Sequence, residues 1–152
     1  MQSPDSSPSK VLFLCSGNYY RSRFAEMLFN ALASEMNLNW TADSGGLIVD
    51  QVTGNVGCCS KATIAALRLR QIDDSGADRM PLQVDNPTLE EAGLIIAVKE
   101  AEHRPMLTKR FPGWEDRVEY WHIHDLDQAT ADQALTEIEE KVQELLARLS
   151  AE

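Results

Sequence analysis

The chain has 152 residues and a formal net charge of −10, from 24 acidic and 14 basic side chains. Such an acidic balance argues against binding to nucleic acid, which needs clustered lysine and arginine, and gives no long-range attraction for an anionic substrate. No run of about 18 apolar residues and no N-terminal signal segment occur, so we expect a cytoplasmic protein without a membrane anchor. Three cysteines form no disulfide framework, which fits a compartment that keeps thiols reduced.

The first half of the chain alternates apolar runs with turn residues. Residues 1–10, rich in serine and proline, are expected to be a disordered lead-in to a single domain that spans residues 11–152. The apolar run at 11–14 predicts a buried parallel strand. Residues 21–36 carry apolar side chains at helical spacing, and residues 39–44 predict a second strand that stops at two glycines.

The second half continues this alternation. The predicted elements are, in order, a helix at residues 62–69, a short extended piece at 80–82, a buried strand at 94–98, a helix at 100–109, a strand at 118–123 and an amphipathic helix at 129–149. Strands that alternate with helices imply right-handed crossovers and a parallel sheet covered on both faces. We therefore predict an α/β, three-layer sandwich with a four-stranded parallel sheet, whose ligands bind at the carboxyl ends of the strands.

An eight-residue loop, Cys-Ser-Gly-Asn-Tyr-Tyr-Arg-Ser at residues 15–22, follows the first predicted strand. Gly17 and Asn18 tolerate left-handed backbone conformations, so the loop can curl with successive N–H groups pointing inward around an anion. The N-terminus of the following helix and the guanidinium of Arg21 would add positive charge to this cradle. A cysteine at its base, Cys15, is favoured as the thiolate and would attack a bound phosphorus in line.

The sequence at residues 11–26 resembles the opening of the low-molecular-weight protein tyrosine phosphatase family, which includes related arsenate reductases. The family pattern is a strand followed by Cys-x-Gly-Asn-x-Cys-Arg-Ser-Pro-x-Ala-Glu. This chain matches it at Cys15, Gly17, Asn18, Arg21, Ser22, Ala25 and Glu26. A weaker resemblance continues at residues 43–45 and 91–98 and covers about residues 11–149. It implies a flavodoxin-like phosphatase domain that hydrolyses phosphomonoesters, above all phosphotyrosine, through a cysteinyl-phosphate.

The resemblance also implies roles for individual residues. Cys15 would be the nucleophile, with the Ser22 hydroxyl donating to its sulfur, and Ser44 would support the loop beside Asn18. Phosphate would be bound by Arg21 and by the other loop residues, namely Ser16, Gly17, Asn18, Tyr19, Tyr20 and Ser22. No cofactor and no metal ion are implied. The partner would be a phosphorylated protein or a small aryl phosphate, with no nucleic acid and no membrane.

The family's general acid is the aspartate of an Asp-Pro pair that follows the last strand. Asp125 aligns best with it, and Leu126 stands in place of the proline. Asp127 would serve the same purpose or would cap the last helix. His122 and His124 share one face of the last predicted strand, but a third metal ligand is not evident.

The chain departs from the family pattern within the loop and directly after it. Tyr20 replaces the second loop cysteine, Arg23 replaces a proline, and Tyr19 replaces an aliphatic residue. We expect Tyr19 and Arg23 to rim the pocket, where Tyr19 would either stack on an aromatic substrate or pack beside the loop.

Two other functions stay open at this point. A thiol-dependent arsenate reductase would need relay cysteines near the middle of the chain, but residues 72–92 contain none, and Cys58 and Cys59 come too early. A non-catalytic phosphate-binding module would keep the cradle without turnover.

Overall fold

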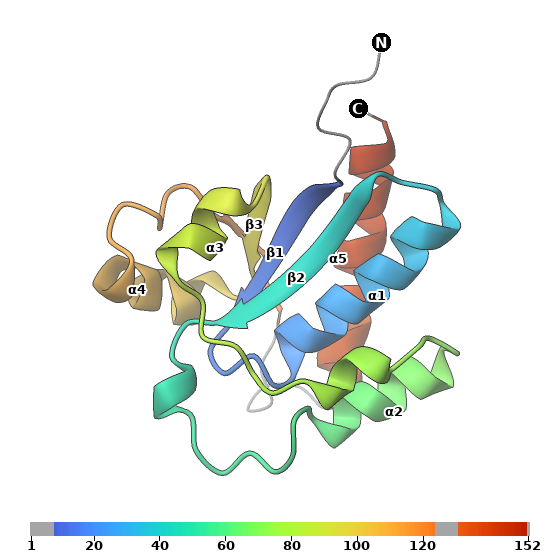
Figure 1. Ribbon diagram of the computed structural model, residues 1–152, viewed down its shortest axis with the longest axis horizontal. Helices are drawn as coiled ribbons and strands as arrows, with labels where there is room; N and C mark the ends of the chain where they lie inside the picture. The colour runs from blue at the N-terminus through green and yellow to red at the C-terminus, as the bar shows by residue number, and fades with distance from the viewer. Residues whose placement is uncertain (1–7, 124–130, 152) are drawn as a thin grey trace.

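A four-stranded parallel sheet organises the computed structural model, which describes residues 8–123 and 131–151 (Figure 1). Its strand order is β2-β1-β3-β4, where β1 spans Ser9–Cys15, β2 spans Trp40–Gly46, β3 spans Leu94–Ala97 and β4 spans Glu119–Tyr120. Each neighbouring pair runs parallel. This order is the flavodoxin-like one and confirms the predicted α/β fold with four parallel strands.

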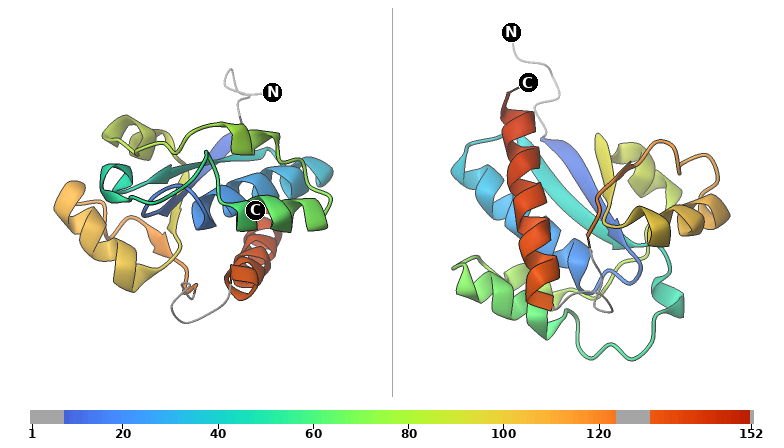
Figure 2. Two further views of the ribbon diagram at one scale, coloured as in Figure 1. Left: turned by 90° about the horizontal axis from the view of Figure 1, so that it is seen from below. Right: turned by 180° about the vertical axis from the view of Figure 1, so that it is seen from behind.

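Helices cover both faces of the sheet and complete the three layers (Figures 1 and 2). On one face lie α1 (Arg21–Glu35) and α5 (Ala131–Ser150), with α2 (Lys61–Leu69) packed against them. On the other face lie the short α3 (Asn86–Glu91) and α4 (Glu100–Arg110). Two 3-10 turns, η1 (Val49–Gln51) and η2 (Ser75–Asp78), lie in the connections.

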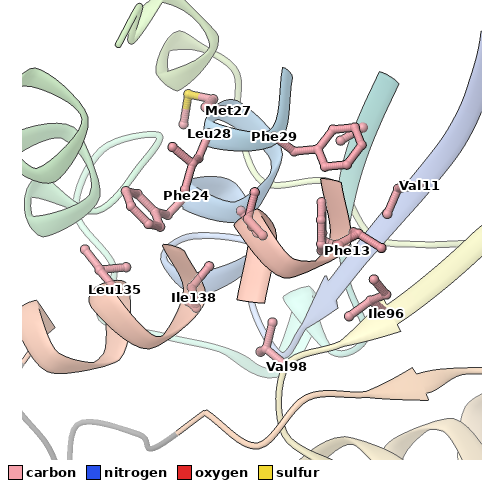
Figure 3. Close-up of a cluster of buried hydrophobic side chains, with 14 of the residues drawn as sticks. Val11, Phe13, Phe24, Met27, Leu28, Phe29, Ile96, Val98, Leu135 and Ile138 are labelled. Atoms are coloured by element: carbon pink, nitrogen blue, oxygen red, sulfur yellow. The ribbon is translucent and has the colours of Figure 1, made fainter. Parts of the chain in front are cut away.

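Strand β1, in the middle of the sheet, is buried on both faces because it is apolar at every position from Val11 to Cys15. Val11, Phe13 and Cys15 face α1 and α5, while Leu12 and Leu14 face α3 and α4. Phe13 packs against Phe29 of α1, with ring centroids 6.1 Å apart (Figure 3). A strand buried in this way is held rigidly, so the loop that leaves its carboxyl end starts from a fixed point.

Several element boundaries differ from the prediction. β2 runs through Gly45 and Gly46, where the second strand was expected to stop. β1 begins at Ser9, inside the expected lead-in, of which residues 1–7 lie outside the described part. α3 was not predicted. The last strand is only two residues long, although Trp121 and Ile123 still donate to the carbonyls of Ala97 and Val98, and His122 forms an isolated antiparallel bridge with Lys99. The expected start of the last helix, at residue 129, lies outside the described residues, and the described part of α5 begins at Ala131.

Among the described residues, no helix has both the length and the apolar composition that crossing a bilayer would require.

Candidate active site

The predicted loop lies at the carboxyl end of β1 and leads directly into α1. The N–H of Leu47 donates to the carbonyl of Cys15 at 2.9 Å, and the N–H of Ile48 donates to that of Ser16 at 3.0 Å. These bonds anchor the start of the loop to the chain that leaves β2. Tyr20 is the N-cap of α1, and the first turn of this helix contains arginines and no acidic residue. The helix N-terminus therefore presents positive charge toward the loop.

Cys15 lies at the base of a pocket of about 290 Å³ and is itself only 3% exposed. Its sulfur is 2.8 Å from the hydroxyl of Ser22. That hydroxyl accepts a hydrogen bond from Nδ2 of Asn18, so its own proton is available to donate to the sulfur. The pocket is lined by Cys15, Ser16, Gly17, Tyr19, Tyr20, Arg21, Val52, Asn55, Ser60 and Ala62.

Asn18 holds the curl of the loop. Its backbone is left-handed, with φ of 50°, and its side chain is fully buried. Nδ2 donates to the hydroxyls of Ser22 and Ser44, at 2.9 and 2.8 Å. Oδ1 accepts from Nη1 of Arg79 and from the N–H of Leu82, both at 2.9 Å. All four hydrogen-bonding positions of the amide are thus filled, which fixes the orientation of a residue in a sparsely populated conformation.

Arg79 extends this support with Glu26. Its Nη2 donates to Oε1 of Glu26 and to the hydroxyl of Ser44, both at 2.9 Å, and Ser44 donates to Glu26 at 2.6 Å. Arg79, Glu26 and Ser44 are therefore hydrogen-bonded to one another, and Arg79 and Ser44 both bind the side chain of Asn18. Sequence reasoning placed Ser44 beside Asn18 but missed Arg79, because the connection to it spans 61 positions of the chain.

Arg21 is paired with a carboxylate that sequence reasoning also missed. Its Nη1 and Nη2 donate to the two oxygens of Glu102, at 3.3 and 2.8 Å. The same carboxylate accepts from the Ser16 hydroxyl and lies 2.9 Å from Nε2 of the buried His103. Burial raises the pKa of the Glu102 carboxyl, but the hydrogen bonds from His103 and Arg21 outweigh it, so the pKa falls well below its usual range. Glu102 is therefore ionised and ties both ends of the loop to α4.

Tyr19 lines the pocket as expected, and its hydroxyl is used to hold a neighbouring loop. The hydroxyl donates to the carbonyl of Val56 at 2.6 Å, and the N–H of Ser60 donates to the carbonyl of Tyr19 at 2.9 Å. These bonds hold the segment at residues 52–60, which forms one wall of the pocket through Val52, Asn55 and Ser60.

The prediction that Arg23 rims the pocket is wrong, because this side chain is 1% exposed. It runs beneath the loop and donates to the carbonyls of Asn18, Cys58, Gly76 and Arg79, at 2.8 to 3.2 Å. A buried guanidinium is tolerated where its N–H groups find acceptors, and these four carbonyls supply them.

The two remaining cysteines do not share the setting of Cys15. Cys59 is buried, and burial raises the pKa of its thiol, which opposes thiolate formation. Cys58 is partly exposed, with its sulfur 3.3 Å from that of Met80.

The predicted general acid Asp125, its alternative Asp127, and His124 lie outside the described residues. His122 is exposed and forms the bridge to Lys99. Across residues 8–123 and 131–151, no group of three or more His, Cys, Asp or Glu side chains is arranged to bind a metal ion.

The family that the chain matches is one of phosphatases, in agreement with the loop and pocket described above. Residues 10–152 match the family model of the low molecular weight phosphotyrosine protein phosphatases. No match is found among the curated proteins.

Solved structures share the fold over nearly the whole chain. YfkJ from Bacillus subtilis is 25% identical, with a TM-score of 0.78 over 95% of this chain and 96% of YfkJ. The low molecular weight protein tyrosine phosphatase from Streptococcus pyogenes is 19% identical, with a TM-score of 0.77 over 93% of each chain. The arginine phosphatase YwlE, from Bacillus subtilis, is 22% identical in a mutant with a phosphorylated active-site serine, with a TM-score of 0.75 over 93% of this chain and 95% of YwlE. The family model covers almost the entire sequence, and this chain therefore belongs to the low molecular weight phosphotyrosine protein phosphatases, a family of hydrolases.

Proposed function

We propose that this chain hydrolyses aryl phosphomonoesters, with phosphotyrosine side chains as the preferred substrate class, through a cysteinyl-phosphate at Cys15. The observation that carries the proposal is the position of the Cys15 sulfur at the base of the pocket, 2.8 Å from the Ser22 hydroxyl. From there the Ser22 hydroxyl can donate a hydrogen bond to the sulfur that attacks phosphorus.

Phosphate binding would use the curled loop, the N-terminus of α1 and Arg21. The loop N–H groups and the helix terminus offer fixed donors, which need no reorganisation when charge develops on the phosphoryl oxygens. Arg21 is oriented by Glu102 through both Nη atoms, so its guanidinium is held in one plane before substrate arrives.

The first chemical step would form a bond between the Cys15 sulfur and phosphorus while the bond from phosphorus to the aryl oxygen breaks. The electron pair leaves with the aryl oxygen, which takes a proton from the carboxylic acid of Asp125. In the second step a water molecule attacks phosphorus and gives its proton back to Asp125. The S–P bond then breaks, and the thiolate and inorganic phosphate are released.

The pocket walls favour an aromatic leaving group. Tyr19, Tyr20 and Val52 line it, and rings pack well against such side chains. We therefore expect phosphotyrosine to be hydrolysed in preference to phosphoarginine, the substrate class for which the similar YwlE is named.

The test compares wild type with Cys15→Ser, Asp125→Asn and Asp127→Asn on a chromogenic aryl phosphate. Cys15→Ser should abolish turnover, and Asp125→Asn should lower kcat by about 10²- to 10⁴-fold. Full activity of Cys15→Ser would overturn the proposed mechanism. Loss in Asp127→Asn with full activity in Asp125→Asn would reassign the general acid. Faster hydrolysis of phosphoarginine than of phosphotyrosine would overturn the substrate class.

A further inference from the structure

Arg23 is a charged side chain that the proposed chemistry does not use. It lies at the third position of α1, two residues after Arg21, and is 1% exposed. Burial lowers its pKa, and the positive charge of Arg79 lowers it further, so holding the cation here has an energetic cost. A hydrophobic side chain would avoid that cost, which indicates that the four hydrogen bonds of Arg23 offset it.

Those four bonds join two other segments of the chain to the loop. Nη1 donates to the carbonyls of Asn18 at 3.2 Å and of Cys58 at 3.0 Å. Nη2 donates to the carbonyls of Gly76 at 3.0 Å and of Arg79 at 2.8 Å. One planar group therefore connects the loop, the start of the chain leading into α2, and the segment around η2.

Arg23 acts on Asn18 by two routes. It binds the Asn18 carbonyl directly, and it binds the backbone of Arg79, whose own side chain donates to Oδ1 of Asn18 at 2.9 Å. The backbone and the side chain of Asn18 are thus both held through Arg23. This matters because Asn18 has φ of 50°, a conformation that persists only where its surroundings enforce it.

We propose that Arg23 is a positioning residue, which with Arg79 keeps Asn18 left-handed and so keeps the N–H groups of the loop aimed at phosphate. If Asn18 relaxes to an ordinary backbone conformation, the peptide that follows it rotates and its N–H leaves the cradle. The inference rests on the proposed function, because it assumes that the loop binds phosphate.

The test measures binding of inorganic phosphate by calorimetry, well below the unfolding temperature, together with kcat/KM on an aryl phosphate. Arg23→Met keeps an unbranched apolar stem but removes the guanidinium and with it all four hydrogen bonds. It should weaken phosphate binding and lower kcat/KM by about 10- to 100-fold, the range expected when a reacting group is misplaced. Arg23→Lys restores the charge and part of the donors. It should recover part of the loss and stay about 2- to 10-fold below wild type, the equivalent of one hydrogen bond.

The matched control is Arg70→Met. Arg70 is partly buried, pairs with Glu139 at 2.9 Å, donates to the carbonyl of Ala66 and lies over the ring of Phe24, all of them outside the loop. Its loss should lower the melting temperature and leave phosphate binding unchanged.

The outcomes separate a positioning role from a structural one. If folded Arg23→Met binds phosphate as wild type does and only melts at a lower temperature, the inference is overturned. If Arg23→Met does not fold, Arg23→Lys decides, and wild-type phosphate binding by that variant overturns the inference. Absence of both phosphate binding and turnover in wild type would overturn the proposed function and this inference with it, whereas equal binding by wild type and variant overturns the inference alone.

Discussion

At the scale of single residues, Gly46 lies in close contact with the backbone of the loop. A Cβ at this position would lie 2.5 Å from Cγ2 of Val49, 2.9 Å from the carbonyl oxygen of Ser16 and 3.0 Å from the N of Asn18. Val49 can rotate away, but the two backbone atoms belong to the loop. The glycine is therefore required by close approach of the loop rather than by its own backbone conformation.

Gly46→Ala should lower kcat/KM by about 100-fold, because the added methyl pushes Ser16 and Asn18 away from their places around phosphate. The control is Gly93→Ala, whose added Cβ has its nearest neighbour, the carbonyl oxygen of Lys10, at an ordinary 3.5 Å. Steady-state kinetics on an aryl phosphate would check both variants. Wild-type activity in Gly46→Ala would show that the loop does not depend on this contact.

Glu102 makes part of the stability of the molecule depend on pH. Its pKa in the folded protein lies well below the ordinary value of 4.5, since hydrogen bonds from His103 and Arg21 outweigh the opposing effect of burial. A depressed folded pKa means that the ionised group contributes stability above the unfolded pKa and loses it as the pH falls toward the folded pKa.

Glu102→Gln should therefore be less stable than wild type at pH 7, by about 2 kcal/mol for the lost charged hydrogen bonds. The difference should shrink as the pH falls below about 4.5, because the unfolded wild-type chain then takes up a proton on this carboxyl while the folded protein keeps it ionised, and the variant has no such group. Urea unfolding followed by circular dichroism at each pH would measure it. A difference that stays constant with pH would contradict the assignment.

At the scale of elements, the segment at residues 52–60 is a pocket wall with few internal supports. It contains Gly54 and Gly57, both with positive φ, and Val56 is 73% exposed. The hydroxyl of Tyr19 reaches it at the carbonyl of Val56. A segment with so few buried contacts opens locally at low free energy, so losing the bond at Val56, while those at Cys58 and Ser60 remain, should raise the rate at which its middle opens.

Tyr19→Phe removes that single bond and keeps the ring. Amide hydrogen exchange in residues 53–58 should accelerate by about 2- to 10-fold, the equivalent of one hydrogen bond. Tyr120→Phe is the matched control, because its hydroxyl donates to the Glu115 carbonyl at 2.7 Å, away from this wall. Exchange measured by mass spectrometry would report both variants. Equal rates in Tyr19→Phe and wild type would show that other contacts hold the wall.

At the scale of the whole molecule, the net charge is negative, but positively charged side chains gather at the candidate site. The chain carries −10, yet Arg21, Arg23 and Arg79 gather around one loop. The electrostatic potential far from the protein is set by its net charge, while the potential in the pocket is set mainly by the nearby arginines. An approaching phosphate dianion is therefore repelled at a distance and attracted only close to the pocket.

Raising the ionic strength from about 20 to about 200 mM with sodium chloride should raise kcat/KM for a small dianionic aryl phosphate about two- to threefold, because salt screens the repulsion. A phosphopeptide rich in lysine should show the opposite dependence, since salt screens its attraction to the acidic chain. Stopped-time assays over a salt series would compare the two. A fall in kcat/KM for both substrates would contradict the repulsion.

The fold was largely predictable because its signals are local. The run Val-Leu-Phe-Leu before Cys15 indicates a strand buried on both faces, and the stripe of apolar residues in α5 indicates a helix packed on the sheet. α3 was missed although Asp85 caps it, because only Leu89 of its six residues is buried and no apolar period develops. β4 was overestimated because only Glu119 and Tyr120 form its regular pairing, while Trp121 and Ile123 continue with single hydrogen bonds to the carbonyls of Ala97 and Val98.

The supports of the candidate site were not predictable in the same way. Glu102 and Arg79 reach the loop from 81 and 61 positions away, and neither stands in a local pattern that marks a partner. Arg23 was placed at the surface because charged residues are rarely buried without partners. Its four partners are backbone carbonyls, which leave no trace in the side-chain sequence.

The filled amide of Asn18 has a consequence for how the protein is made. During synthesis the N-terminal strand, the loop and the first helix leave the ribosome before the rest of the chain. The groups that fix Asn18 come from Ser44, Arg79 and Leu82, so the nascent chain carries the cysteine and the arginine of the loop before it can give them their arrangement. We expect the loop to bind anions only after residue 82 has been translated and has left the ribosome, although the loop itself is among the first parts of the chain to be made.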